Sequence, residues 1–197
     1  MSRRARTDRH SSRPPDQRAG QCYDPLLRYR RRVLTDAQAE RLAACARVLD
    51  PPARIVMTGH VAAGALAAVT GAARPGVEVL ALGAGEVARV DGSIDMLFIG
   101  PAVRYSAAVE TFQRWPGRVV PGGTLFVHGA FATPPLTAAL VRTVGSSRAW
   151  RYFGRDGALA EYVRADLTIG ERVLDVIAQL AQMPSFVRRL ARQARRT

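Results

Sequence analysis

Short apolar runs alternate with longer amphipathic stretches from about residue 36 onward. Each run is rich in valine, leucine and isoleucine and ends near a glycine or a proline, a pattern typical of buried strands. The strands that this pattern predicts are residues 54–58, 77–82, 93–99 and 124–128, with a hairpin of 149–153 and 158–163 around residues 154–157. The predicted helices are residues 36–49, 61–73, 105–115, 135–144 and about 170–195, the last interrupted near Pro184.

This order of elements indicates an α/β fold with a mostly parallel sheet and an antiparallel C-terminal hairpin. Right-handed crossovers place helices on both faces of such a sheet, and ligands bind at the carboxyl ends of its strands. Three of the predicted strand ends carry Gly59, Gly83 and Gly100, and the fourth carries His128. A glycine there either lets a ligand approach the backbone or simply ends the strand, and the sequence leaves both readings open.

The length and composition limit the class of protein. A chain of 197 residues suits one domain with tails and is too short for two full domains. A hydrophobic content of 48% excludes wholesale disorder, and no apolar stretch approaches the ~20 residues of a membrane-spanning helix. Cys22 and Cys45 lack metal-binding spacing, and no apolar segment follows the N-terminal arginines. We therefore expect a cytoplasmic location, or a peripheral one on a membrane.

The net charge of +13 is concentrated at the two ends of the chain. Residues 1–32 hold ten arginines against three aspartates, and residues 185–197 hold five arginines and no acidic residue. The 14 arginines and 13 acidic residues of the middle, 33–184, leave it at only +1. The chain has no lysine at all, which is typical of a GC-rich genome. We expect a basic, largely disordered tail over residues 1–32, an α/β domain over 33–168 and a basic amphipathic helix over 169–197.

The arginine-rich ends point to several alternative partners. Such segments bind nucleic-acid backbones without sequence choice, although these tails lack aromatic side chains for base stacking. The C-terminal segment also carries an apolar stripe at helical spacing, formed by Val173, Ile177, Leu180, Met183, Val187 and Leu190. We expect the part before Pro184 to pack on the domain or on a second copy in a homodimer, and the basic end to lie on an anionic membrane surface.

Two segments resemble the second half of a class I S-adenosylmethionine-dependent methyltransferase, closest to a small bacterial branch. They are Ile94-Asp95-Met96-Leu97-Phe98-Ile99, followed by Tyr105, and Val119-Val120-Pro121-Gly122-Gly123-Thr124-Leu125-Phe126-Val127-His128. The hairpin at 149–163 is similar to the last two strands of that family, so the resemblance covers residues 54–163. It implies a Rossmann-like three-layer sandwich and S-adenosylmethionine as the methyl donor.

The resemblance also implies where the donor lies. The residues that match the donor loop are Thr58, Gly59, His60 and Gly64; those near the ribose are Gly83 and Glu86; those near the adenine are Gly100 and Ala102. His128 is the candidate catalytic base at a strand end, because methyl transfer needs positioning and a proton acceptor. A buried structural role is the alternative for His128, and we expect structural roles for Asp95 and Tyr105.

The chain departs from the family in its acidic residues. Met57 stands where the family has an acid before the donor loop, and Leu82-Gly83-Ala84 replaces the acid that holds the ribose, with Glu86 as the nearest substitute. Only about ten residues separate the second and third predicted strands, so one βα unit is expected to be absent. The family's other acids at the strand ends are missing too, which argues against a metal site because divalent cations need several oxygen ligands.

Three functions follow from these observations. The first is methyl transfer from S-adenosylmethionine to a small-molecule or lipid-linked substrate. The second is a catalytically inactive scaffold that keeps the methyltransferase fold. The third is binding of nucleic acid or an anionic surface through the arginine-rich tails. Binding of the donor, or its failure, separates the first function from the other two.

Overall fold

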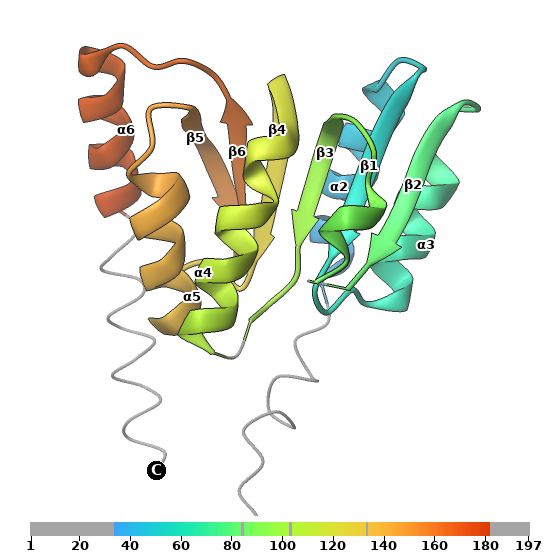
Figure 1. Cartoon of the computed structure of the whole chain (residues 1–197), viewed down its shortest axis with the longest axis horizontal. Coiled ribbons are helices and arrows are strands. Elements are labelled where there is room, and N and C mark those ends of the chain that lie inside the picture. Colours follow the sequence, from blue (N-terminus) through green and yellow to red (C-terminus); the bar gives the residue numbers. More distant parts are fainter. Residues whose placement is uncertain (1–33, 84, 103, 133, 182–197) are drawn as a thin grey trace, which may run out of the picture. The chain divides into compact units, whose positions relative to one another are not determined.

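A mixed sheet of six strands, in the order β2-β1-β3-β4-β6-β5, forms the centre of the described chain (Figure 1). The computed structural model describes residues 34–83, 85–102, 104–132 and 134–181, all within the unit Val33–Thr197. The strands are β1 (Ala53–Thr58), β2 (Val77–Leu82), β3 (Ile94–Ile99), β4 (Val119–His128), β5 (Trp150–Asp156) and β6 (Leu159–Arg164). Strands β2, β1, β3 and β4 are parallel, whereas β6 and β5 are antiparallel to their neighbours, as predicted.

Helices cover both faces of this sheet (Figure 1). The helices are α2 (Asp36–Val48), α3 (Ala63–Ala72), α4 (Tyr105–Arg114), α5 (Pro134–Leu140) and α6 (Ile169–Leu180), with the short helical turns η1 (Glu86–Arg89), η2 (Pro116–Arg118) and η3 (Val141–Gly145). Helices α2 and α3 pack on one face, and α4 and α5 on the other. The expected three-layer α/β architecture is therefore confirmed.

Alternate strand residues point into two separate cores, as the period of two in a strand requires. Leu97 of β3 packs with Trp115 and Phe112 under α4, whereas its neighbour Phe98 packs with Leu42 under α2. Both faces of β1, β3 and β4 are buried, which explains why these strands read as continuous apolar runs rather than alternating ones.

Helix α2 begins where the sequence predicts. The Thr35 side chain accepts a hydrogen bond from the Gln38 backbone, and the Gln38 side chain accepts one from the Thr35 backbone. This capping box satisfies two N–H groups that a helix start leaves open. The Gln38 amide also donates to the Asp156 carbonyl at 2.7 Å, which ties α2 to the end of β5.

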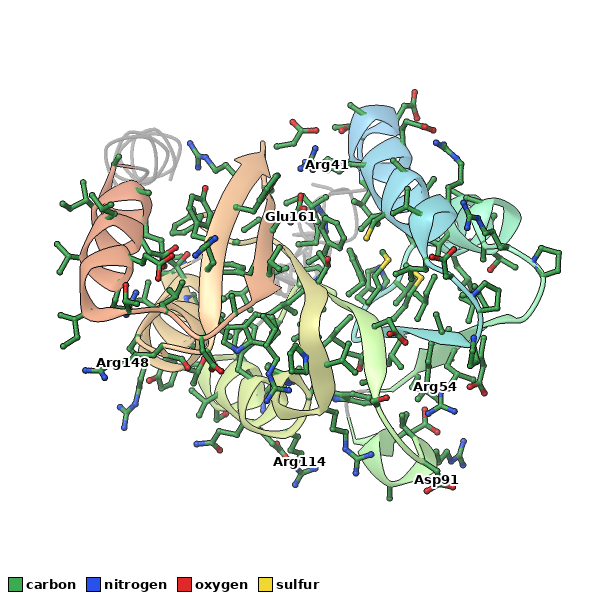
Figure 2. The ribbon with its side chains drawn as sticks, turned by 90° about the horizontal axis from the view of Figure 1, so that it is seen from above. Arg41, Arg54, Asp91, Arg114, Arg148 and Glu161 are labelled. Carbon is green, nitrogen blue, oxygen red and sulfur yellow. The ribbon has the colours of Figure 1, made fainter. Side chains whose placement is uncertain are left out.

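Only η1 connects β2 to β3, so the described residues contain no further strand–helix unit at this place. Strand β2 is consequently the edge of the sheet, with β1 as its one neighbour among the described strands. Arg54 of β1 supports this region, because its guanidinium donates to Glu78 of β2 at 2.6 Å and to the Asp91 carbonyl (Figure 2). The absence of one βα unit is thus confirmed.

Two predicted boundaries were wrong. The fourth strand was expected to begin at residue 124, yet β4 begins at Val119 and carries residues 121–123 as an irregularity, with Ile94 opposite Val119 and Met96 opposite Thr124. The hairpin turn lies at Gly157–Ala158 rather than over 154–157, because β5 continues to Asp156 and a register shift follows Tyr152. In both cases glycines inside the strand were taken for the end of the strand.

Helix α6 lies along β5 at the outer end of the sheet (Figure 1). Its packed side is polar: the buried Asp175 carboxylate accepts hydrogen bonds from the Tyr152 backbone N–H and from Gln179, and pairs with Arg172. The apolar residues Val173 and Ile177 are 54% and 57% exposed. Packing of this stripe on the domain, the first of the two alternatives, is therefore wrong for these two residues, because Asp175 on the opposite side of the helix binds the Tyr152 N–H of β5. Packing on a second copy stays a prediction.

The remaining predicted segments lie outside the described residues. They are the basic segment 1–32 and the part of the predicted C-terminal helix from residue 182 onward. Within the part of the chain that the structure describes, no helix is long and apolar enough to cross a membrane.

Candidate functional site

The carboxyl ends of β1, β2, β3 and β4 meet at one edge of the sheet, and all the predicted site residues lie on or next to it. Strand β1 ends at Thr58, whose side chain is buried and whose hydroxyl has no hydrogen-bond partner among the described residues. Gly59 follows with a φ of +80°, a conformation that side chains rarely adopt. The chain therefore turns sharply at Gly59 before it enters α3.

The start of α3 presents open backbone at this edge. No side chain caps this helix, and the N–H groups of Ala65 and Leu66 both donate to the Ala62 carbonyl. The N–H groups of Ala63 and Gly64 come before this first bond and have no intrahelical acceptor. Gly64 lies in the first turn, and a Cβ atom there would have no heavy atom within 4 Å. The helix dipole also favours an anionic group at this end. The turn at Gly59 and the start of α3 can thus receive a carboxylate or a similar polar group.

Gly100 at the end of β3 serves a different purpose. A Cβ atom at this position would lie 2.4 Å from the His60 carbonyl oxygen and 2.7 Å from its nitrogen. The Gly100 N–H donates to the Thr58 carbonyl at 2.8 Å, so the loops after β1 and β3 are in direct contact. The chain's own backbone therefore accounts for this glycine.

Glu86 folds back onto the end of β2. One carboxylate oxygen accepts a hydrogen bond from the Gly83 N–H at 2.5 Å, and the other pairs with Arg89 at 2.6 Å. A carboxylate has about four acceptor positions, so these two partners leave room for a ligand hydroxyl. The side chain is 35% exposed and can be reached.

Two further residues follow β3 at this edge. Ala102 is half-buried against the core beneath α4, so its methyl group contributes to packing. Tyr105, the first residue of α4, is 41% exposed and belongs to neither core. The structural packing role expected for Tyr105 was wrong, because the first residue of α4 stays largely exposed to solvent.

His128 ends β4 but is almost fully buried. Only 4% of its surface is exposed, and its ring stacks on Phe98 with 6.5 Å between centroids. It faces the core under α2, in the same row of β4 as Phe126. This environment favours a structural histidine, whereas His60, two residues after Thr58, is exposed at the same edge.

Two further positions, Met57 in β1 and Asp95 in β3, have structural roles. Met57 is fully buried in the core under α2 and α3, and Asp95 accepts a hydrogen bond from the Arg54 N–H at 2.7 Å. The structural role expected for Asp95 is thus confirmed. Within the described residues, no three histidine, cysteine or acidic side chains gather in a group that could hold a metal ion.

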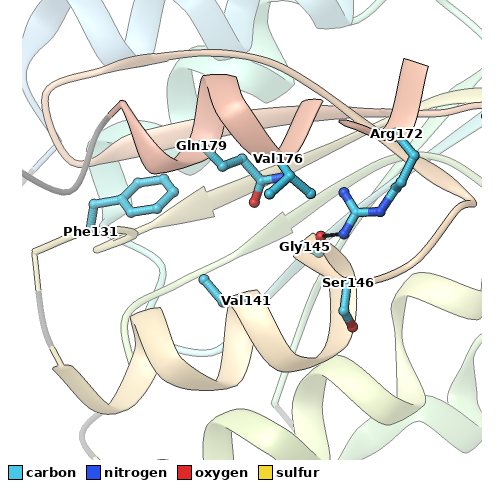
Figure 3. Close-up of a pocket in the computed structure, with 7 residues that line it drawn as sticks. All are labelled: Phe131, Val141, Gly145, Ser146, Arg172, Val176 and Gln179. Carbon is cyan, nitrogen blue, oxygen red and sulfur yellow. Dashed lines mark hydrogen bonds between the residues drawn. The ribbon is translucent and has the colours of Figure 1, made fainter. Parts of the chain in front are cut away.

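A small apolar cavity lies beyond the end of β4, between η3 and α6 (Figure 3). Its volume is about 120 Å³, and its lining includes Phe131, Val141 and Val176. Phe131 has a φ of +53°, which is strained for an aromatic residue. Backbone strain of this kind is often found near functional sites. The Arg172 side chain at the cavity is held by the Gly145 carbonyl and by Asp175. This volume is far below the ~300 Å³ or more of typical ligand pockets.

Comparisons by sequence identify no relative, since no family model and no curated protein matches the chain. Solved structures do match. A Corynebacterium glutamicum protein superposes with a TM-score of 0.55 at 9% identity, over 68% of this chain and 82% of that one. The SAH-bound methyltransferase PaMTH1 from Podospora anserina gives 0.53 at 10% identity, over 68% and 80%. The O-methyltransferase from Bacillus cereus, in complex with SAH, gives 0.52 at 10% identity, over 68% and 83%.

This chain spans about half the length of TrmN from Thermus thermophilus, since the match covers 65% of this chain and 48% of that protein. The fold of the three proteins with TM-scores of 0.52 to 0.55 agrees with the sheet order, the antiparallel hairpin and the helices on both faces. The described part of the chain therefore has the fold of the class I S-adenosylmethionine-dependent methyltransferases.

Proposed function

We propose that this protein binds S-adenosylmethionine at the carboxyl ends of β1 and β2 and transfers its methyl group to a small-molecule or lipid-linked acceptor. The observation that carries this proposal is the start of α3, where the left-handed turn at Gly59 leads into an uncapped helix with open space at Gly64. This arrangement, in a methyltransferase fold, suits the charged end of an amino-acid-bearing nucleoside.

The residues present fit this ligand in two places. Backbone N–H groups at the start of α3 are suited to the donor's carboxylate, and the free acceptor positions of Glu86 to a ribose hydroxyl. The space near Gly100 is narrower than the resemblance implies, because the His60 backbone occupies it. The adenine would accordingly lie toward Ala102 and Tyr105 rather than against Gly100.

When bound, the donor would supply the methyl group of its sulfonium. The methyl–sulfur bond breaks as the acceptor takes the methyl group, and the sulfur remains as a neutral thioether. The protein's contribution is to align the acceptor with that methyl group and to accept the proton that the acceptor gives up. Exposed His60 is better placed to take this proton than His128, which is buried against Phe98. We therefore assign His128 to support of the strand end and His60 to proton transfer.

A second candidate function is that of an inactive scaffold with the same fold. It is favoured by the burial of His128 and by the internal hydrogen bonds that already engage Glu86. Binding of nucleic acid through the arginine-rich ends stays a prediction from the sequence, because those residues lie outside the described part of the chain.

Calorimetric titration of the full chain with S-adenosylmethionine and with S-adenosylhomocysteine tests the proposal. We expect saturable heat with both ligands. The absence of saturable heat at about 1 mM ligand would overturn the proposal and favour the scaffold.

A further inference from the structure

The outward side of α6 is apolar although the helix lies at the surface. Ile169, Val173 and Ile177 follow one another at intervals of four residues, and Leu174 lies beside them. These four side chains are between 54% and 68% exposed, and no described residue covers them. We call them the α6 face. Ordinary surface helices show the opposite pattern, with their apolar side turned inward.

The contacts of α6 hold this inverted orientation in place. Asp175 and Gln179 are 6% and 7% exposed on the packed side, and the Gln179 amide donates to Asp175 at 2.6 Å. Arg172 joins Asp175 to the Gly145 carbonyl at the end of η3 (Figure 3). Rotating the helix to bury the α6 face would leave Asp175 without these partners. Loss of its hydrogen bonds and ion pair is costly for a buried carboxylate.

The described charges near the α6 face have a small basic excess. Arg151 pairs with Glu171 at 2.5 Å and Arg172 pairs with Asp175, so these two pairs contribute no net charge. Arg142 and Arg148 are exposed against one exposed acid, Asp166, and the Arg148 carbonyl accepts a hydrogen bond from Leu167, just before α6 (Figure 2). The sequence directly after α6 adds five arginines and no acidic residue over 185–197. An apolar helix side that is followed in the sequence by such a cationic segment is suited to an anionic lipid surface.

The size of the α6 face separates a membrane from a second protein. A helix of 12 residues is about 18 Å long and about 10 Å wide, so its face covers roughly 180 Å² in projection. Stable dimers bury about 800 Å² per partner. The α6 face is therefore too small to hold a dimer by itself, whereas shallow insertion at the lipid headgroups needs only one such helix side.

We propose that the α6 face docks onto anionic bilayers, with the following arginine-rich residues supplying electrostatic attraction. Docking is reversible, because one short apolar helix side gives only modest membrane affinity. It also falls with added salt, because the attraction between the arginines and the lipid headgroups is screened. The proposal is independent of the methyl donor, so a failure of either leaves the other testable.

Vesicle sedimentation with the full chain tests this proposal. The wild-type protein should bind vesicles that contain phosphatidylglycerol and bind poorly to pure phosphatidylcholine. The double variant Val173→Asn/Ile177→Asn leaves the net charge unchanged and should weaken binding to the anionic vesicles by at least about tenfold. Val48→Asn is the matched control, since Val48 is 68% exposed on α2, and it should bind like the wild type.

Four results would overturn the proposal. The first is wild-type protein that fails to sediment with anionic vesicles. The second is a double variant that binds these vesicles as well as the wild type does, because the arginines alone would then account for binding. The third is a dimer in solution that the double variant dissociates, because the occupant would then be a second copy. The fourth is a marked loss of thermal stability in the double variant without any lipid binding, because another segment of this chain would then cover the α6 face.

Discussion

The His60 backbone lies so close to Gly100 that a Cβ atom at position 100 would be 2.4 Å from the His60 carbonyl oxygen. The two residues follow the parallel strands β1 and β3, so their contact locks together the loops at the ligand-binding edge of the sheet. The glycine at position 100 is thus required by the protein's own packing, whether or not a ligand is bound.

Substitution of Gly100 by alanine should therefore destabilise the fold. The new methyl group would overlap backbone atoms that cannot rotate away, and overpacking of this kind costs about 1–3 kcal/mol. Urea unfolding of Gly100→Ala measures the loss. Gly71→Ala is the control, because a Cβ atom there meets nothing within 4 Å and alanine favours a helix. A Gly100→Ala protein as stable as the wild type would show that the loops separate readily.

Gly64→Ala should weaken binding of S-adenosylmethionine without weakening the fold. The position is open in the protein alone, so a loss of affinity would report a ligand against the first turn of α3. Gly71→Ala, in the same helix and equally open, should bind like the wild type. Calorimetry on both variants makes the comparison, and equal affinity in the two would place the donor elsewhere.

Glu86→Gln should reduce affinity for the donor by about tenfold, because a charge-assisted hydrogen bond to the ribose becomes a neutral one. The control is Glu110→Gln, which removes an exposed glutamate that also pairs with an arginine, Arg114, away from the strand ends. An unchanged dissociation constant for Glu86→Gln would confine Glu86 to closing the turn at Gly83.

Tyr162→Phe should stabilise the protein by about 1 kcal/mol, because the Tyr162 hydroxyl is buried without a hydrogen-bond partner among the described residues. Burial also raises the pKa of this phenol, which keeps it neutral. Tyr152→Phe is a useful comparison: its hydroxyl is also unpartnered, but the residue is less buried, so the gain should be smaller. Thermal unfolding of Tyr162→Phe that begins at a lower temperature would contradict this prediction.

Helix α6 should loosen in acid. Hydrogen bonds from the Thr168 backbone and hydroxyl, with the nearby Arg151, lower the pKa of Glu171 below its ordinary value of 4.5. A carboxyl whose pKa falls on folding stabilises the protein above its unfolded pKa, and this contribution disappears as the pH drops through the lower folded value. The contribution is present at neutral pH and is lost below about pH 4.

Glu171→Gln tests that pH dependence, because glutamine keeps the capping box, as Gln38 does in α2. The difference in unfolding temperature between wild type and variant should be largest near neutral pH and should shrink below about pH 4. A difference that stays constant over this range would show that the charge on Glu171 has no part in stability.

The strands along the chain were predictable because apolar residues that are buried on two faces leave an uninterrupted pattern, as in residues 94–99. The orientation of α6 was not. Periodicity identifies Val173 and Ile177 as one side of a helix, but the neighbour of that helix is the N–H edge of β5, which binds Asp175 instead. The pattern of a helix alone does not reveal what lies against it.

The surroundings of the candidate site were only partly predictable. The glycines that follow β1, β2 and β3 could be placed at the edge where the parallel strands end, and the structure has them there. The space around each glycine depends on contacts between distant loops: Gly64 in α3 is open, whereas the His60 backbone fills the space at Gly100. The exposure of Tyr105 was not predicted, and for His128 the sequence left a catalytic and a buried structural role open, because both depend on what packs around the strand ends.

Helix α6 also affects how readily another strand could pair with the β5 edge of the sheet. The Asp175 carboxylate already accepts the Tyr152 N–H of this edge strand. A strand that paired there would have to displace a buried carboxylate from its hydrogen bonds to Tyr152 and Gln179. Such protection of an edge strand reduces unwanted pairing between chains.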